Sequence, residues 1–347
     1  MKSPYEFLQK KHFWKLSVPD SADSVEDMYI KRFSISGKRI ATAGSCFAQE
    51  IARELRKRGH ILVDKEPSPG TLEIRGDIEQ KYGYGLYSAR HGNIYTARQL
   101  LQLSQEAFGV LRPSPDEYVW TRDDRFFDAL RPSVEPNGLS SIQEVVLQRL
   151  DHVRRFKQVL LETDIFIFTL GLTEAWENIK SGLIYPTAPG TIAGDFSDGF
   201  CKFVNFGFAD VYNDFIAFRN LVKDHNKNIK FIITVSPVPL TATASNDHVL
   251  VATVRSKSVL RAVAAQLYDE FNDVDYFPSY EIFSTPFLGG SLFKENKRNV
   301  TRSGVAAAMK VFFGQHSSSE CLNGTEAEND SSVCEDALLD AFAGDKK

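Results

Sequence analysis

Ser45 is the residue of this chain whose setting most favours chemistry. It lies in the segment Ala-Gly-Ser-Cys-Phe-Ala at positions 43–48, directly after an apolar run at residues 39–42 that is typical of a strand. Residues 49–58 then space their apolar side chains as a helix does. A serine between a strand and a helix N-terminus lies beside backbone N–H groups that can stabilise an oxyanion. Ser45 is therefore a candidate nucleophile for acyl transfer, and the commoner alternative is a serine that only caps the helix.

Four other side chains are candidates for supporting roles. Glu174 follows the next apolar run, where its carboxylate could orient a base, act as the base or bind a substrate hydroxyl; the alternative is a glutamate that opens a helix. His91 directly precedes a glycine turn and is the best placed of the seven histidines to act as a base. Trp176 and Tyr185 belong to an aromatic, proline-rich stretch that could line a sugar pocket, although core packing explains aromatic residues equally well.

The cysteines suggest no metal site and no disulfide framework. Cys46, Cys201, Cys321 and Cys334 lack the spacing of either, so a reducing cytosol fits best. Cys46 is a rival nucleophile beside Ser45. We rank it lower, because the residue that follows a turn serine on a helix usually packs inward.

The elements that must position these residues alternate between strands and helices. Apolar runs at 164–170 and 230–236 are typical of strands buried on both faces, and a shorter strand is expected at 274–277. Further helices are predicted at 141–162, 208–226, 247–272 and 302–313. This order predicts an α/β fold in one large domain, with a doubly wound parallel sheet flanked by helices in a three-layer, flavodoxin-type arrangement.

Each predicted strand ends in a turn with a distinctive sequence. The first ends at Gly44-Ser45, and the next three end in Gly-Leu-Thr-Glu-Ala-Trp at 171–176, Ser-Pro-Val-Pro-Leu at 236–240 and Phe-Pro-Ser-Tyr-Glu at 277–281. Because the carboxyl ends of parallel strands meet at one edge of a sheet, these turns are expected to converge there. The convergence strengthens the expectation of a site at that edge.

Five ordered motifs together resemble the GSCFA-domain family, which is named for the first of them and is similar to the SGNH/GDSL hydrolases. They lie at residues 43–48, 92–96, 170–176, 235–239 and 276–281. The resemblance covers roughly residues 32–313.

That resemblance implies a serine-dependent acyl esterase or O-acyltransferase, with a carbohydrate ester as a substrate suggested by the family and by the aromatic stretch. It places Ser45 at the position of the nucleophile. It places Gly92 and Asn93 in the second block, whose backbone N–H contributes to the oxyanion hole. Thr173 stands where the superfamily has an amide side chain in Gly-x-Asn-Asp.

The chain departs from the superfamily at the position of the base. The superfamily has Asp-x-x-His before the last helix, and Asn296 and Asn299 stand at those two positions here. A neutral amide cannot take the proton of Ser45. The resemblance therefore implies an inactive or impaired enzyme, through a natural or an engineered loss, or a non-catalytic SGNH-like ligand-binding module. Asn299→His is expected to raise esterase turnover, and Asn296→Asp to add to that gain.

The composition is that of an ordinary globular protein. The 347 residues are 43% hydrophobic and 25% charged with a net charge of −4, which gives no reason to expect nucleic acid or an anionic membrane as a partner. There is no apolar run long enough for a membrane span, no signal peptide, no nucleotide-binding glycine motif and no His/Cys cluster. We therefore expect a cytoplasmic protein without metal or cofactor that acts on a small-molecule or carbohydrate ester.

Three regions are predicted along the chain: an N-terminal extension (1–31), a GSCFA/SGNH-like domain (32–315) and an acidic tail (316–347). Residues 317–347 hold eight acidic and two basic side chains and few large apolar ones, so a disordered tail of little importance for stability is expected. A short amphipathic helix at 333–342 is the alternative.

Overall fold

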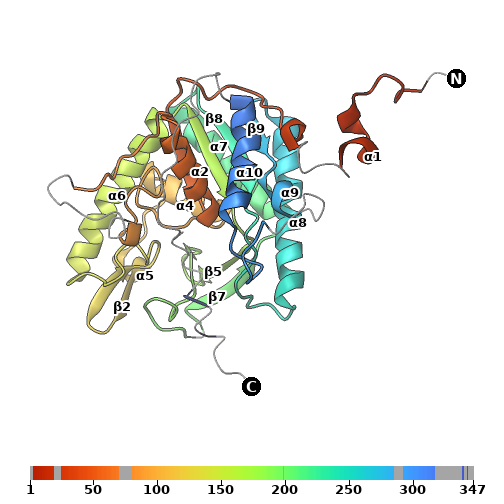
Figure 1. Ribbon diagram of the computed structural model, residues 1–347. Coiled ribbons are helices and arrows are strands. Elements are labelled where there is room, and N and C mark those ends of the chain that lie inside the picture. Colours follow the sequence, from red (N-terminus) through yellow and green to blue (C-terminus); the bar gives the residue numbers. More distant parts are fainter. Residues whose placement is uncertain are drawn as a thin grey trace.

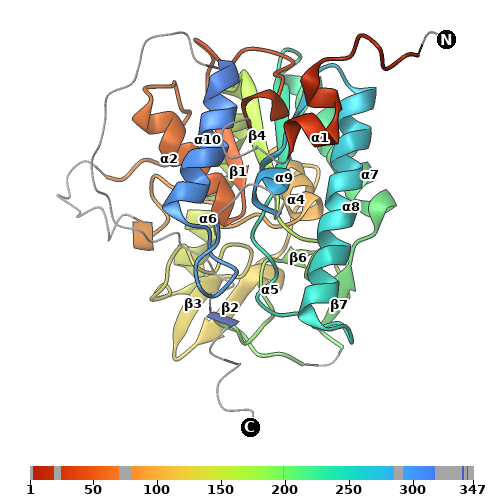
Figure 2. The same cartoon turned by 45° about the vertical axis from the view of Figure 1, so that its right-hand side comes forward.

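A parallel four-stranded sheet lies at the centre of the protein (Figure 1). The computed structural model describes residues 3–18, 25–69, 80–197, 199–284 and 292–316, together with 338, 339 and 342. The sheet has the order β1-β4-β8-β9, and its strands are Ile40–Gly44, Ile165–Leu170, Lys230–Val235 and Val274–Phe277. Helices lie on both sides of it (Figure 2). The predicted three-layer α/β architecture is therefore confirmed.

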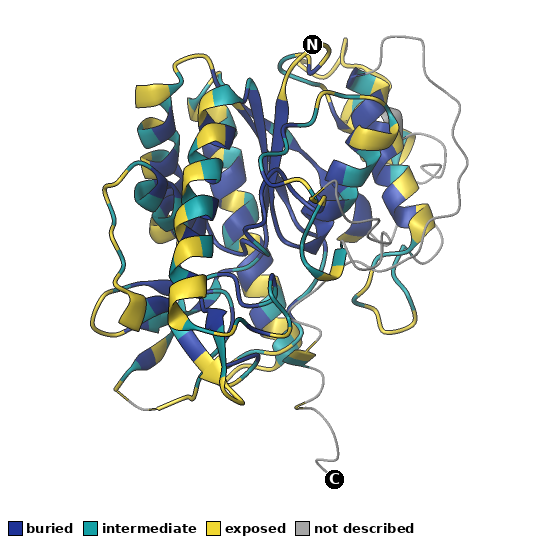
Figure 3. Cartoon of the chain, turned by 90° about the vertical axis from the view of Figure 1, so that its left-hand side faces the viewer, coloured by how far each residue is buried: buried dark blue, intermediate teal, exposed yellow. Residues whose placement is uncertain are grey.

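The strands are apolar on both faces because both faces are covered (Figure 3). Phe166 and Phe168 of β4 join one cluster, to which α4 (Ala97–Ala107), α6 (Ile142–Glu162), α7 (Phe208–His225) and α8 (Val249–Glu270) contribute. Ile165 and Ile167 join the opposite cluster with α2 (Cys46–Lys57), α9 (Ser279–Ser284) and α10 (Arg302–His316). Alternate side chains of a strand point to opposite faces, which explains the continuous apolar runs in the sequence.

Two small antiparallel sheets that were not predicted extend the structure beyond the main sheet (Figure 1). In one, β5 (Glu174–Asn178) pairs with β6 (Ile184–Tyr185) and β7 (Cys201–Asn205). The other is the pair of β2 (Val119–Arg122) and β3 (Arg125–Asp128). The alternative that Glu174 opens a helix is wrong, because this residue begins β5.

The topology reverses direction at β1. Ile40 pairs in parallel with Ile165 of β4 on one side and forms a parallel bridge with Leu62 on the other. After β1 the chain first passes on the side of Leu62 and later returns on the opposite side of β1 to form β4. In open α/β sheets, ligands bind outside the carboxyl ends of the strands at such a switch point. The topology therefore directs attention to the ends of β1 and β4.

Parts of the flanking regions pack on the domain. Tyr29 is buried, stacks against Phe312, and donates a hydrogen bond from its hydroxyl to Asp275 (2.8 Å). Helix α10 continues to His316, which is also buried. Most of the acidic tail, including Cys321, Cys334 and most of the possible helix at 333–342, lies outside the described residues; Leu338 and Phe342 are exposed. None of the helices in the described ranges is long and apolar enough to cross a membrane.

Candidate functional site

Gly44 shapes the turn at the end of β1. Its φ of +141° lies in a region that other residues rarely adopt. A Cβ at this position would lie 2.7 Å from both Cβ and the carbonyl oxygen of Thr169 on β4. Glycine is therefore required for β1 and β4 to lie side by side here, and the turn then delivers Ser45 to the start of α2.

Ser45 stands at the N-cap position of α2, but its hydroxyl does not cap the helix. The residue is 5% exposed, and its Oγ has no hydrogen-bond partner among the described residues. By contrast, the Thr96 side chain caps α4 by accepting a hydrogen bond from the Gln99 N–H. A buried polar group without a partner costs about 1–3 kcal/mol. Helix capping therefore does not explain why a serine occupies this position.

Residues 92–95 lie between the ends of β1 and β4. The N–H of Ile94 donates to the carbonyl oxygen of Gly44 (2.9 Å). On the other side, the carbonyl oxygen of Tyr95 accepts hydrogen bonds from the N–H groups of Gly171 (3.0 Å) and Leu172 (3.1 Å). The first three motifs of the sequence therefore meet at the switch point; for the first and the third, their positions at strand ends predicted this.

The backbone of Gly171 lies close to Ser45 in this arrangement. A Cβ on Gly171 would lie 2.9 Å from the carbonyl oxygen of Tyr95 and 3.3 Å from Cβ of Ser45. The backbone of Gly171 therefore forms one wall of the space around Ser45, and any larger residue would press on both neighbours.

Asn93 is held beside Ser45 by a buried tyrosine. Oη of Tyr87 lies 2.6 Å from Oδ1 of Asn93 and 3.3 Å from the carbonyl oxygen of Ser45. Nε2 of Gln49 donates to Tyr87 Oη (3.0 Å) and to Asn93 Oδ1 (3.4 Å). Oδ1 of Asn93 is the acceptor in these bonds, so the Nδ2 amide group is the hydrogen-bond donor of this side chain. Gly92 has a φ of +68° and lines a narrow cavity together with Asn93.

The two polar residues after β4 are occupied by neighbouring elements. The Thr173 hydroxyl donates to Oδ1 of Asn205 on β7 (2.7 Å), so this bond uses the hydrogen that an oxyanion would need. Oε1 of Glu174 accepts a hydrogen bond from Thr243 (2.8 Å), and burial raises the pKa of this half-buried carboxyl.

Trp176 and Tyr185 pair across β5 and β6. Tyr185 is completely buried, and its hydroxyl donates to the carbonyl oxygen of Glu117 (2.6 Å). Burial raises its pKa to about 12. Tyr185 therefore packs in the core of the small sheet. Trp176 is half-buried, with its ring edge-to-face against Phe196 (5.3 Å) and Phe203 (5.8 Å), and its contact with a substrate stays a prediction.

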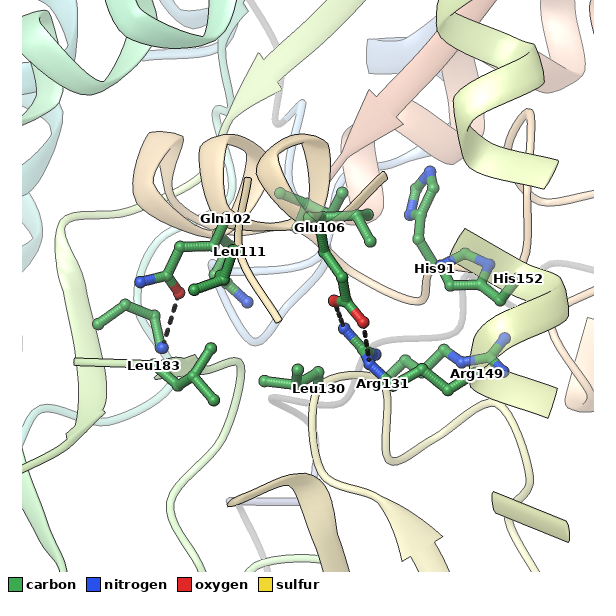
Figure 4. Close-up of a pocket in the computed structure, with 13 residues that line it drawn as sticks. His91, Gln102, Glu106, Leu111, Leu130, Arg131, Arg149, His152 and Leu183 are labelled. Carbon is green, nitrogen blue, oxygen red and sulfur yellow. Dashed lines mark hydrogen bonds and ion pairs between the residues drawn. The ribbon is translucent and has the colours of Figure 1, made fainter. Parts of the chain in front are cut away.

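His91 lies in a cluster of buried charged residues (Figure 4). Its ring is 3% exposed, its Nδ1 lies 2.7 Å from the carbonyl oxygen of Gly92, and its Nε2 has no hydrogen-bond partner in the described ranges. With His152 and Arg149 it lines a cavity of about 30 Å³, which has room for a water molecule. Burial lowers the pKa of His91 to about 4. No hydrogen bond joins this ring to Ser45 Oγ.

The same cluster contains His152 of α6. Its Nδ1 lies 2.7 Å from Oε2 of Glu66, and the neighbouring Asp128 accepts hydrogen bonds from Arg131 (2.8 Å) and Arg149 (3.1 Å). Burial alone would raise the pKa of Glu66, but the charges of His152 and Arg131 outweigh it and hold that pKa well below its usual range. The cluster thus joins α6 to the loops around His91.

Asn296 and Asn299 lie in a loop before α10 that is closed by an antiparallel bridge between Phe293 and Val300. Oδ1 of Asn296 accepts hydrogen bonds from the backbone N–H groups of Arg298 (3.1 Å) and Asn299 (3.0 Å). Both asparagines are exposed, and Oδ1 of Asn299 lies 3.4 Å from Nη1 of Arg298. Neither side chain is hydrogen-bonded to Ser45 Oγ, because that atom has no partner among the described residues.

The two cysteines in the described ranges are buried. Cys46 packs inward after Ser45, as predicted, and burial raises the pKa of the Cys201 thiol to about 11. The part of the chain that the structure describes contains no cluster of three or more His, Cys, Asp or Glu side chains arranged to hold a metal.

Lys257 of α8 reaches the site, and sequence reasoning missed it. Its side chain is 1% exposed, and its Nζ donates a hydrogen bond to the carbonyl oxygen of Gly171 (2.6 Å). The preceding residue, Ser256, accepts a hydrogen bond from the Thr173 N–H (3.0 Å). A signal did exist: Lys257 shares the helical spacing of the apolar face that includes Leu260 and Ala264, where a lysine is out of place.

Comparison with known families gives a match over most of the domain. The profile described as the GSCFA family matches residues 39–312, a span from just before β1 into α10. No curated protein and no solved structure gives a significant match.

Proposed function

The chain belongs to the GSCFA family, and we propose that it is a serine-dependent acyl esterase or O-acyltransferase with Ser45 as its nucleophile. The observation that carries this proposal is the hydroxyl of Ser45, which is buried at a helix N-terminus, caps nothing and has no hydrogen-bond partner among the described residues. Such a destabilising arrangement is typical of a functional site.

The reaction would begin when Oγ of Ser45 attacks the carbonyl carbon of an ester. The π electrons of the carbonyl move to its oxygen, and backbone N–H groups of the first turn of α2 and of Gly92 would stabilise the resulting oxyanion. Asn93, whose amide end is oriented by Tyr87, would supply a further donor. The alkoxide leaves, and water or an acceptor hydroxyl then takes the acyl group from Ser45.

The substrate proposed is a small-molecule ester, with a carbohydrate ester as the specific candidate. Glu174 would accept a hydrogen bond from a sugar hydroxyl, and Trp176 would pack against a sugar face. Because Oγ of Ser45 is buried, a substrate reaches it only after a neighbouring segment moves.

By the resemblance to the SGNH hydrolases, Asn299 would stand at the position of their histidine. If no other group accepts the proton, acyl transfer is impaired, and the chain acts instead as a ligand-binding module that retains the fold. These alternatives make different predictions for a reagent that reacts only with an activated serine.

The test uses the full chain with a fluorophosphonate probe and p-nitrophenyl esters. We expect labelling of the peptide that contains residues 43–48 and slow ester hydrolysis, with both lost in Ser45→Ala. Cys46→Ala is the matched control, because it removes the adjacent rival nucleophile and should leave labelling intact. A wild-type protein that is neither labelled nor active towards esters would refute the proposal and favour the binding module.

A further inference from the structure

We propose that the ε-amine of Lys257 is the proton acceptor for Ser45. This inference rests on the proposed acyl transfer, for which a base is required and for which Asn299 offers only an amide. It adds a residue from α8, an element outside the five motifs of the sequence.

The geometry places Lys257 and Ser45 on the same glycine. Nζ of Lys257 lies 2.6 Å from the carbonyl oxygen of Gly171, while a Cβ on Gly171 would lie 3.3 Å from Cβ of Ser45. Lys257 thus contacts the carbonyl oxygen of Gly171, and Ser45 lies beside the Cα of the same residue. The same turn is anchored to α8 a second time by the bond from the Thr173 N–H to Ser256 (3.0 Å), so α8 and the turn form a fixed unit.

The chemistry of a buried lysine fits the missing function. Burial opposes the charged form of an amine, which is why buried lysines serve as general bases. A neutral amine has two N–H donors and one lone pair. One N–H can remain on the carbonyl oxygen of Gly171, and this bond would hold the lone pair in a defined direction while it receives the proton of Ser45.

The other candidate bases are less suitable. His91 is hydrogen-bonded within its own turn and lines a separate cavity, and Asn299 has no proton sink. Glu174 is bound to Thr243 through Oε1. Arg255 and Asp247 act electrostatically on Glu174 in this turn, so the pH profile of each variant must be compared with that of the wild type.

The proposed steps balance. The proton of Ser45 moves to Nζ of Lys257 while the bond from Oγ to the carbonyl carbon forms and the π electrons move to the carbonyl oxygen. When the tetrahedral intermediate collapses, the bond to the leaving oxygen breaks, and that oxygen takes the proton from Nζ. Water or an acceptor hydroxyl then attacks the acyl-enzyme, gives its proton to Nζ, and Ser45 regains a proton as it leaves.

The experiment measures the rate of fluorophosphonate labelling from pH 5 to pH 10 for the full chain and its variants. Lys257→Met should lower the rate by about 10²–10⁴-fold, the usual contribution of a general base, and should remove the pH dependence that belongs to the acceptor. Ser256→Ala is the matched control, because it loosens the same turn but leaves the amine. We expect it to change the rate without a shift of the pH profile.

A second substitution at position 257 and rescue by an added amine test the same role of Lys257. If Lys257→Met does not fold, Lys257→Arg retains a cation and hydrogen-bond donors but cannot accept a proton in this range; loss of labelling with an unchanged melting temperature supports the inference. Methylamine should partly restore labelling of Lys257→Ala. If folded Lys257 variants have the labelling rate and pH profile of the wild type, Lys257 is not the proton acceptor, and the proposed role of Ser45 is unaffected. Absence of wild-type labelling would overturn the proposed function, and this inference with it.

Discussion

Gly171→Ala tests the close packing on which the site depends. The added Cβ would lie 2.9 Å from the carbonyl oxygen of Tyr95, 3.2 Å from its Cα and 3.3 Å from Cβ of Ser45. All three distances are shorter than ordinary van der Waals contact. Relief requires Tyr95 to move, yet its carbonyl oxygen accepts hydrogen bonds from the N–H groups of Gly171 and Leu172. The strain therefore cannot relax without a loss elsewhere in the turn.

The expected cost is that of overpacking in a close-packed interior, about 1–3 kcal/mol. With a urea dependence of about 3 kcal/mol/M, this corresponds to a decrease of roughly 0.3–1 M in the urea midpoint. Labelling of Ser45 should also fall, because the same displacement moves the serine away from the proposed oxyanion donors.

Gly314→Ala is the matched control. Gly314 lies in α10, and a Cβ there would meet nothing within 4 Å. Alanine in a helix is more stable than glycine by up to roughly 1 kcal/mol, and by less in the last turn where Gly314 lies, so this variant should be at least as stable in urea as the wild type and label at the wild-type rate. If Gly171→Ala is as stable and as reactive as the wild type, Ser45 is not confined by this turn and the description of the site is wrong.

Three further predictions concern the buried polar groups and the loop before α10. Ser45→Ala should raise the free energy of unfolding by roughly 1 kcal/mol, since it removes a buried hydroxyl without a partner among the described residues; a loss of stability in urea titration would contradict this. Burial lowers the pKa of His91 to about 4. The unfolded chain therefore binds more protons than the folded one below about pH 6.5. As the pH is lowered from 6.5 to 4, the free energy of unfolding should decrease by up to about 1.4 kcal/mol per pH unit. His91→Phe should reduce that slope, and an unchanged slope would show that His91 is not responsible. The family resemblance implies a gain for Asn299→His, but the exposed position of Asn299 and its contact with Arg298 favour a change in labelling of no more than about two-fold, as for independent sites; a ten-fold gain would show that the loop faces Ser45.

The main sheet and its helices could be predicted from the sequence because their signals are local. Each of the four strands and five helices expected from apolar spacing lies within three residues of its observed bounds. Burial on both faces produces the continuous apolar runs, and helix periodicity produces the spacing in between. The turn that presents Ser45 was also evident, because a glycine directly after an apolar run and before helical spacing indicates a tight turn.

The small sheets could not be predicted in this way. The strand β5 contains polar residues, β6 has only two residues, and β5 pairs with β7, which lies more than 20 residues further along the chain, so no local pattern indicates the pairing. Consequently the roles of the residues that follow β4 were ambiguous. Tertiary packing decided that Tyr185 is a core residue and that the Thr173 hydroxyl is used by Asn205.

The partners of Ser45 depended on tertiary structure most of all. The sequence identified the serine, two blocks near it and the absence of a histidine at position 299. It did not indicate that Lys257 would reach Gly171, a residue 86 positions earlier, or that His152 would meet Glu66 across the same separation. Sequence periodicity records which face of a helix is buried, but the neighbours of that face are determined only when helices pack onto the sheet. A lysine on the apolar face of α8 therefore acquires a role only in the folded protein, where that face lies against the turn that confines Ser45.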